Sequence, residues 1–290
     1  MTFLTRGVCL SLLLHGGCAP QVVNAVGEGG GAGFANGGEG ATSGEGGSVS
    51  GGGGATGNPL GLRTLVHRYD FEGTGTVVYD SAGSADGVVI NTELAGDGSV
   101  VLGGEPTNQY VDLPRFIVSR LDSATFEAWV TWAGTGGPYQ RVFDFGQAAN
   151  MPGELGPNDT ALDGLQYLYL ATRSELGRIV VAYQRQDPME LRLEVPITFP
   201  ANDLTQIVIT VEHRQRLSMY LNGELLSTRD FPEALVDIND VNNWLGRSLY
   251  VQDETFAGAF HEFRIYSVAL TEAQVRANFD SGPDQVGVLP

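Results

Sequence analysis

The sequence predicts an all-β protein, an antiparallel β-sandwich or jelly roll that ends in one short C-terminal helix. From residue 63 onward, short runs of β-branched and aromatic residues recur between glycine, asparagine and aspartate. This spacing is typical of sandwiches and barrels. Asn222 and Gly223 join two such runs directly, which indicates a two-residue hairpin turn. Thr271 and Gln274 fit a capping box, which predicts that a helix begins there.

The expected strands follow one another at short intervals along the chain. Within the segment 124–132, apolar Phe126 and Val130 alternate with polar Glu127 and Thr131, which predicts a strand with one face toward a core. We expect strands over residues 65–71, 77–79, 88–91, 99–102, 110–113, 124–132, 141–145, 165–171, 179–183, 191–195, 204–211, 217–221 and 224–228.

The segment 256–270 is the longest strand-like run of this region. Its apolar residues fall on both alternating faces, with Phe260 on one and Phe263 on the other. A strand of this kind lies in the middle of a sandwich or contains a bulge. In the helix that follows, Val275 and Phe279 are four residues apart and therefore share a face. We expect this face to pack on a sheet.

Composition excludes several classes of function. The net charge is -18, with 16 basic and 34 acidic residues, and every basic residue is arginine. Without lysine, Schiff-base and P-loop chemistry that needs a lysine amine is excluded. The acidic balance argues against nucleic acid and against anionic lipid as partners. The cysteines are Cys9 and Cys18, so the rest of the chain has no disulfide framework, cysteine-type zinc site or thiol nucleophile.

The N-terminal region reads as an export signal followed by a linker. Residues 1–18 combine Arg6, a short apolar run and the sequence His15-Gly16-Gly17-Cys18, which resembles a bacterial lipobox. This predicts lipidation of Cys18 and a protein held at the cell envelope or cell surface. A simple signal peptide, cleaved nearby to give a secreted protein, and a retained segment are the alternatives. Residues 19–62 are rich in glycine and predict a disordered tether. We expect one domain over residues 63–282 and a tail over 283–290.

Two stretches near the C-terminus carry a family resemblance. The sequence Trp244-Leu245-Gly246-Arg247-Ser248 and the segment 256–270 resemble the C-terminal signature of laminin-G-like jellyroll domains, in the concanavalin A-like lectin/glucanase superfamily. The resemblance covers roughly residues 65–282 and implies a sandwich, but one such fold hosts many activities. The matching residues are Phe256, Gly258, Glu262, Phe263, Arg264, Ile265, Tyr266, Ala269 and Leu270. At His261 the family usually has aspartate.

The same resemblance suggests calcium as a cofactor. The loop from Asp80 to Gly87 resembles a turn that helps hold calcium in many family members, with Asp80 and Asp86 as the side-chain ligands. His261 replaces a carboxylate that the family usually adds. Aspartate and glycine are also ordinary turn formers, so a plain hairpin loop is the alternative. A second acidic loop, residues 237–243, lacks EF-hand spacing and is expected to be solvated.

Motifs for hydrolysis are missing from the sequence. Glycosidases need two carboxylates across the sugar bond, and the E-x-D-x-x-E pattern of related laminarinase-type enzymes does not occur. The nearest sequence, from Glu190 to Glu194, has Arg192 at the central position, which is typical of alternating charges on an exposed strand. G-x-S-x-G is also absent from the domain. We therefore assign no enzymatic activity.

Aromatic residues in loops are the remaining candidates for binding. Sugar rings stack on aromatic faces while nearby polar groups fix their orientation. Tyr139 and Tyr250 lie in loops, and they would form a glycan or peptide site at one rim together with Arg141, Asn242, Asn243 and Asp253. The alternative is that these tyrosines are merely half-packed.

Three functions remain open from the sequence. The first is a non-catalytic surface module that binds glycans or extracellular matrix. The second is a structural or protein-adhesion module without carbohydrate binding, and the third is a glycoside hydrolase or lyase. The expected partners are a glycan or an extracellular protein, with no nucleic acid and with membrane contact only through a lipid anchor.

Overall fold

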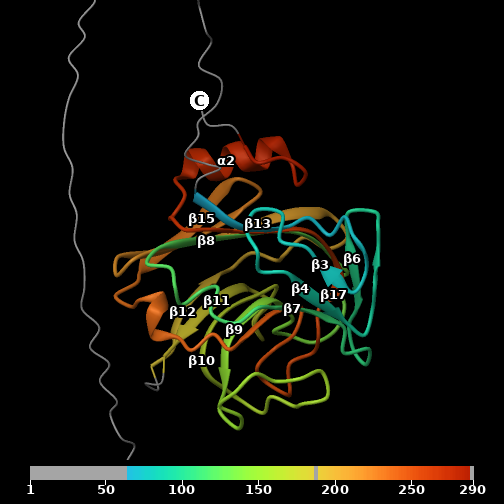
Figure 1. Ribbon diagram of the computed structural model, residues 1–290. Coiled ribbons are helices and arrows are strands. Elements are labelled where there is room, and N and C mark those ends of the chain that lie inside the picture. Colours follow the sequence, from blue (N-terminus) through green and yellow to red (C-terminus); the bar gives the residue numbers. More distant parts are fainter. Residues whose placement is uncertain (1–63, 186–188, 288–290) are drawn as a thin grey trace, which may run out of the picture. The chain divides into compact units, whose positions relative to one another are not determined.

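The structure, a computed structural model, describes residues 64–185 and 189–287. The predicted signal segment with Cys18 and the glycine-rich linker lie outside the described residues. The predicted fold class is confirmed, because two antiparallel sheets form layers and one short helix follows the last strand (Figure 1). Among the described residues, none of the helices has the length and apolar character needed to cross a membrane.

One layer is a seven-stranded sheet. Its strand order is β1-β17-β8-β13-β14-β15, and β6 also pairs with β17. The strands are β1 (Leu65–Tyr69), β6 (Val100–Gly103), β8 (Ala124–Trp132), β13 (Leu204–Glu212), β14 (Arg216–Leu221), β15 (Glu224–Asp230) and β17 (Ala257–Tyr266).

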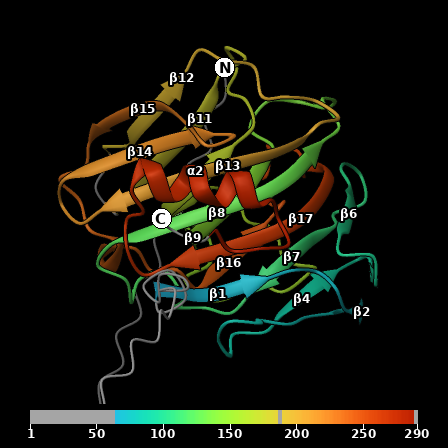
Figure 2. The same cartoon turned by 90° about the horizontal axis from the view of Figure 1, so that it is seen from above.

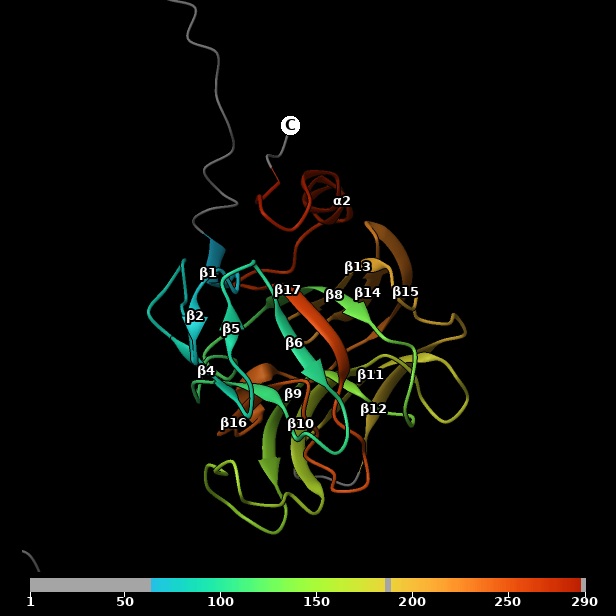
Figure 3. The same cartoon turned by 90° about the vertical axis from the view of Figure 1, so that its right-hand side faces the viewer.

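The other layer is an eight-stranded sheet in the order β12-β11-β10-β9-β16-β7-β4-β3. Its strands are β3 (Val77–Val78), β4 (Gly87–Ile90), β7 (Tyr110–Leu113), β9 (Arg141–Ala148), β10 (Gly164–Ala171), β11 (Ile179–Gln184), β12 (Leu191–Val195) and β16 (Asn242–Leu245). The short strands β2 (Thr74–Gly75) and β5 (Leu94–Ala95) pair with each other, and the 3-10 helix η1 covers Leu235–Asp237. Figure 3 shows the two layers from the side.

The main core lies between the two sheets. Because side chains alternate along β8, Phe126 and Val130 point inward and belong to this core. The Phe126 ring lies 5.5 Å from the rings of both Phe143 and Phe145 on β9. The inner face of each sheet is therefore occupied by the other sheet, which leaves only the two outer faces and the loops for other contacts.

Strand β17 is central, as the sequence predicts. It pairs with β8 on one side and with β1 and β6 on the other, and the register with β8 shifts between Phe260 and Glu262. This bulge explains the mixed pattern, because it lets Phe260, Phe263 and Ile265 all join the core. Glu262 and Arg264 are both buried and form an ion pair with each other.

The helix α2 (Glu272–Ser281) covers the outer face of the seven-stranded sheet (Figure 2). The predicted capping box is present, with Thr271 and Gln274 bonded reciprocally. Val275 is buried, and the Phe279 ring stacks on Trp129 of β8 with 5.9 Å between centroids. The helix covers only part of this face, because a cavity of about 320 Å³ lies beside it over β13, β14 and β15.

Candidate ligand-binding site

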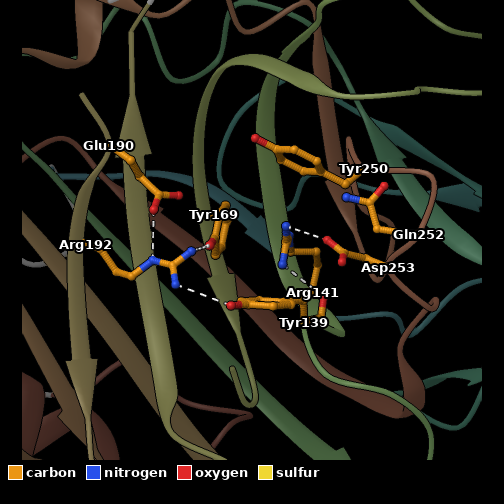
Figure 4. A pocket seen from close by; sticks show the side chains of 8 residues that line it. All are labelled: Tyr139, Arg141, Tyr169, Glu190, Arg192, Tyr250, Gln252 and Asp253. Atoms are coloured by element: carbon orange, nitrogen blue, oxygen red, sulfur yellow. Dashed lines mark hydrogen bonds and ion pairs between the residues drawn. The ribbon is translucent and has the colours of Figure 1, made fainter. Parts of the chain in front are cut away.

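A cavity of about 190 Å³ lies on the outer face of the eight-stranded sheet (Figure 4). Strands β9, β10 and β12 supply part of its lining, and the loop between β16 and β17 supplies the opposite side. The lining residues are Tyr139, Arg141, Tyr169, Glu190, Arg192, Tyr250, Gln252 and Asp253. Figure 4 shows Glu190 and Arg192 facing the three residues of that loop.

A bulge turns Arg141 toward this cavity. The register between β9 and β10 shifts so that Ala171 pairs with Arg141 while Leu170 pairs with Phe143. Val142 and Phe143 consequently both join the main core, and Arg141 faces outward. Its guanidinium lies 3.7 Å from the centre of the Tyr169 ring, so the cation is supported by the face of an aromatic residue.

Two carboxylates fix the Arg141 guanidinium. Its Nε lies 3.1 Å from Asp144 Oδ2, and its Nη2 lies 2.8 Å from Asp253 Oδ2. The side chain is only 2% exposed. Arg141 also donates through Nη1 to the carbonyl oxygen of Tyr139 at 3.0 Å. This arginine therefore ties the β8–β9 connection to the β16–β17 loop and is itself rigid.

Arg192 forms a second, more open charge cluster. Its Nε lies 2.8 Å from Glu190 Oε2 and its Nη1 lies 3.2 Å from Glu194 Oε1. It also donates to the hydroxyl oxygens of Tyr139, at 3.3 Å, and Tyr169, at 3.2 Å. The hydroxyl groups of both tyrosines are thereby oriented, and their rings are held at the edge of the cavity.

The two loop tyrosines are both half-buried. Tyr139 has a φ of 62°, an uncommon conformation for a non-glycine residue that the contacts of its carbonyl and hydroxyl groups support. The Tyr250 ring packs edge-on against Tyr167 at 5.8 Å. The Tyr250 amide donates to the Ser248 hydroxyl, which in turn donates to Asp253. Two partly exposed aromatic rings are thus held in fixed positions on opposite sides of the cavity.

Burial governs the protonation of the buried acids and phenols here. Burial raises the pKa of Asp144 to about 6, against the opposing effect of Arg141. It also raises the pKa of Asp253, which Arg141 again counteracts. The pKa of the Tyr169 hydroxyl is raised by burial as well. At neutral pH the tyrosine is therefore a neutral hydrogen-bonding group, while Asp144 is mainly ionised.

Four of the residues that the sequence singles out meet at this cavity. They are Tyr139, Arg141, Tyr250 and Asp253. Asn242 and Asn243 do not, because both are buried on β16. Asn242 accepts the Leu155 amide, and Asn243 donates to the carbonyl of Pro114. Their assignment to a surface rim is therefore corrected: they satisfy buried backbone groups.

Sequence reasoning missed the other half of the lining. Tyr169 sits in an apolar strand, and only the strand register shows that it faces outward. The sequence predicts alternating charges on an exposed strand at Glu190 and Arg192, whereas both are partly buried and bonded to tyrosine hydroxyls. The alternating charges mark residues 190–194 in the sequence. They do not show that this segment lies beside the tyrosines of β10. Gln252 carried no signal beyond its place beside Asp253.

The Asp80 loop does not have a donor set that fits calcium. Asp80 Oδ1 accepts the amides of Arg68, Ala82 and Gly83, and Oδ2 accepts the Ala85 amide and contacts His67 Nδ1 at 2.7 Å. This carboxylate, whose side chain is 0% exposed, already has five partners.

The other two expected calcium ligands have protein partners as well. Asp86 Oδ1 accepts the Asp80 amide, and His261 Nε2 lies 3.0 Å from Thr131 Oγ1. Across residues 64–185 and 189–287, no group of three or more potential ligands is arranged to hold a metal. Calcium binding stays a prediction that the geometry of this loop does not support.

The second acidic loop also differs from the prediction. Asp240 is fully buried, and its carboxylate accepts the amides of Val118 and Ser119. It also accepts a hydrogen bond from Asn243 Nδ2 at 3.1 Å. The expectation of a solvated loop is therefore wrong at Asp240, whose carboxylate is the hydrogen-bond acceptor for these N–H groups.

The fold and this cavity define a β-sandwich whose polar, tyrosine-lined site lies on the outer face of one sheet. The chain belongs to the concanavalin A-like lectin/glucanases superfamily, because the laminin-G-type model of that superfamily matches residues 103–276, more than half of the sequence. The resemblance noted in the sequence is thereby confirmed. Among curated proteins, none matches this chain significantly.

Solved structures with a similar fold include both binding domains and enzymes. The binding domain of botulinum neurotoxin DC, in complex with rat synaptotagmin II, has a TM-score of 0.56 at 13% identity, covering 76% of this chain and 52% of the other. Domain 4 of AbnA, a GH43 extracellular arabinanase from Geobacillus stearothermophilus, in complex with arabinotriose, has a TM-score of 0.50 at 18% identity, covering 73% and 97%. A Trypanosoma rangeli sialidase, in complex with 2,3-difluorosialic acid, has a TM-score of 0.55 at 18% identity, covering 78% and 34%.

These likenesses concern the fold. The chain spans about half the length of the toxin binding domain and about a third of the sialidase. It spans nearly the full length of the arabinanase domain.

Proposed function

We propose that the chain is a non-catalytic glycan-binding module and that the cavity on the eight-stranded sheet holds a sugar. The observation that carries this proposal is the pair of fixed, half-buried rings of Tyr139 and Tyr250 on either side of a polar cavity. Sites for small ligands combine aromatic surfaces with a few fixed polar groups. Rings that are already held in place lose little conformational entropy when a sugar stacks on them.

The charges of the site favour an uncharged sugar. Two arginines, Arg141 and Arg192, face four carboxylates, those of Asp144, Asp253, Glu190 and Glu194. Both guanidinium groups are therefore already neutralised by the protein. An acidic sugar would compete with these carboxylates for the arginines, and its own charge would meet the net charge of -18.

The same ion pairs favour binding without catalysis. A glycosidase needs one carboxyl that acts as an acid and a second that acts as a nucleophile or base. Here Glu190 is bonded to Arg192, and Asp253 is bonded to both Arg141 and Ser248. Both carboxylates are therefore occupied by protein partners, and neither is free to face a sugar bond.

A glycan array tests this proposal. The array carries uncharged plant and bacterial oligosaccharides together with sialylated glycans, and it is probed with the wild-type protein and with Tyr139→Ala. We expect wild-type binding to uncharged glycans and a loss of about tenfold or more in the variant, because a stacking surface is removed. Binding only to sialylated glycans would refute the charge argument. Binding to synaptotagmin-like proteins without any glycan would favour the adhesion alternative, since the similar toxin domain is seen with a protein partner.

We also propose that the module works outside the cytoplasm, tethered through Cys18 and the glycine-rich residues 19–62. The lipobox-like residues 15–18 support this proposal. Metabolic labelling with a palmitate analogue should tag the wild type and not Cys18→Ser. An unlabelled wild type found in the culture medium would instead indicate simple secretion.

A further inference from the structure

A second cavity, of about 210 Å³, adjoins the first. Tyr250 and Asp253 line both cavities. These two side chains form the partition, so the two cavities are adjacent.

The partition between the cavities is rigid. Asp253 Oδ2 forms an ion pair with Arg141 Nη2 at 2.8 Å and accepts a hydrogen bond from the Ser248 hydroxyl at 2.9 Å. Tyr250 is held through its amide by the same hydroxyl and through its ring by Tyr167. A ligand that enters either cavity therefore meets a preformed wall, and no rearrangement is needed for the other cavity to be filled as well.

The second cavity contains a buried cation of a different kind. Arg247 is 6% exposed, and its guanidinium lies 4.1 Å from the centre of the Trp244 ring. It donates to the Tyr110 hydroxyl at 2.8 Å and to the carbonyl of Asp159. Unlike Arg141 and Arg192, it makes no ion pair with any carboxylate of the described residues. An arginine has five N–H donors, so donors remain for a ligand.

A buried hydroxyl in the same cavity has no partner. Thr255 is 4% exposed, and its Oγ1 makes no hydrogen bond within the described part of the chain. Leaving a buried polar group unpaired is unfavourable, so a ligand group that bonds to it gains affinity. The charged groups of the first cavity are paired with one another, whereas the second offers both a donor and a hydroxyl.

We propose that the two cavities are adjoining subsites of one site and that the ligand is a linear, uncharged oligosaccharide of at least two units. One sugar unit stacks between Tyr139 and Tyr250, and the next lies beyond Tyr250, where its hydroxyls bond to Arg247 and Thr255. This inference rests on the proposed glycan-binding function and specifies the length of the ligand.

Calorimetric titration with monosaccharides, disaccharides and trisaccharides of arabinose, xylose and glucose tests the proposal. In one of these series we expect the disaccharide to bind the full chain at least about tenfold more tightly than the monosaccharide, because the second subsite adds hydrogen bonds. Thr255→Val, which keeps the side-chain shape, should weaken disaccharide binding about two- to tenfold and leave monosaccharide binding unchanged. Arg247→Gln should do the same more strongly, with a melting temperature that shows the fold is intact.

Thr228→Val, on an exposed position of β15 in the other sheet, is the matched control and should bind like the wild type. Equal affinity of the wild type for all lengths, or disaccharide binding that Thr255→Val and Arg247→Gln both leave unchanged, would overturn the two-subsite proposal while glycan binding stands. If no sugar of any length binds in any of the three series, the proposed function fails together with it.

Discussion

Asp80 shows how one buried carboxylate organises a loop. Four backbone amides and the His67 ring converge on it. Burial alone would raise the pKa of Asp80, but the contacts with His67 and the amides of Arg68, Ala85 and Gly83 outweigh burial and lower it. The charged form is thus the stable one in the folded protein, and the loop closes around it.

We predict that Asp80→Ala lowers the free energy of unfolding by about 2–4 kcal/mol, because it leaves several buried amides without an acceptor. Urea unfolding measures this change. Calcium at millimolar concentration should leave the melting temperature of the wild type unaltered. A rise with calcium that disappears in Asp80→Ala would show instead that the sequence-based assignment of a calcium site is right.

Individual residues of the site were only partly predictable. Tyr139, Tyr250 and Asp253 stand out in the sequence because they lie in segments rich in turn residues. Such loops often carry the side chains that bind ligands. Arg141 faces the cavity only because of a bulge opposite β10, and a bulge leaves no clear trace in one sequence. Asn242 and Asn243 are residues of a type common in loops. In the fold they bond to buried backbone groups of Leu155 and Pro114, which are distant in the sequence.

At the scale of elements, a buried polar network joins α2 to the sheet. Asn278 Nδ2 donates to Glu127 Oε2 at 2.7 Å and to the Tyr266 hydroxyl at 2.9 Å. Asn278 Oδ1 accepts the Gly287 amide, so the segment after the helix is held as well. Glu127 also pairs with the buried Arg264. Removing one member of such a network leaves the others buried without partners.

Asn278→Ala should therefore destabilise the protein by about 2–3 kcal/mol, mainly because Glu127 loses a buried donor. Thr271→Ala in the same helix is the comparison, since it removes only the N-cap and should cost about 1 kcal/mol. Thermal unfolding of both variants measures the difference. Equal losses would mean that helix propensity, and not the buried network, holds α2 on the sheet.

The elements themselves were largely readable from the sequence. The Asn222-Gly223 turn directly joins β14 and β15, with positive φ at both residues as a type I′ turn requires. The capping box and the central position of β17 are also local or pattern-based signals. Which strands of the two sheets face each other depends on contacts between distant segments, so it could not be read from single runs of residues.

At the scale of the whole molecule, burial sets the dependence of stability on pH. Burial raises the pKa of Asp112 to about 6, with Glu154 adding to the rise and Arg247 opposing it. Asp144 is raised to about 6 by burial as well. An unfolded aspartate has a pKa of about 3.9. Between these values the folded state binds more protons than the unfolded state, so stability increases as the pH falls.

We predict that the melting temperature rises by a few degrees when the pH is lowered from about 7 to about 5. Weaker repulsion among the acidic residues acts in the same direction. Below about pH 4 the trend reverses, because the stabilisation from Asp80, complete above its unfolded pKa, is lost as the pH falls through its lowered folded pKa. Asp112→Asn should reduce the rise between pH 7 and 5. A melting temperature that falls steadily over that interval would contradict this assignment.

We propose that an uncharged glycan binds on the outer face of the eight-stranded sheet. A crystal structure of the protein with the oligosaccharide that binds most tightly would locate the sugar. We expect a sugar ring between Tyr139 and Tyr250, with Arg141 and Arg192 still paired to their carboxylates. Sugar density on the α2 face or at another loop, with this cavity unfilled, would contradict it.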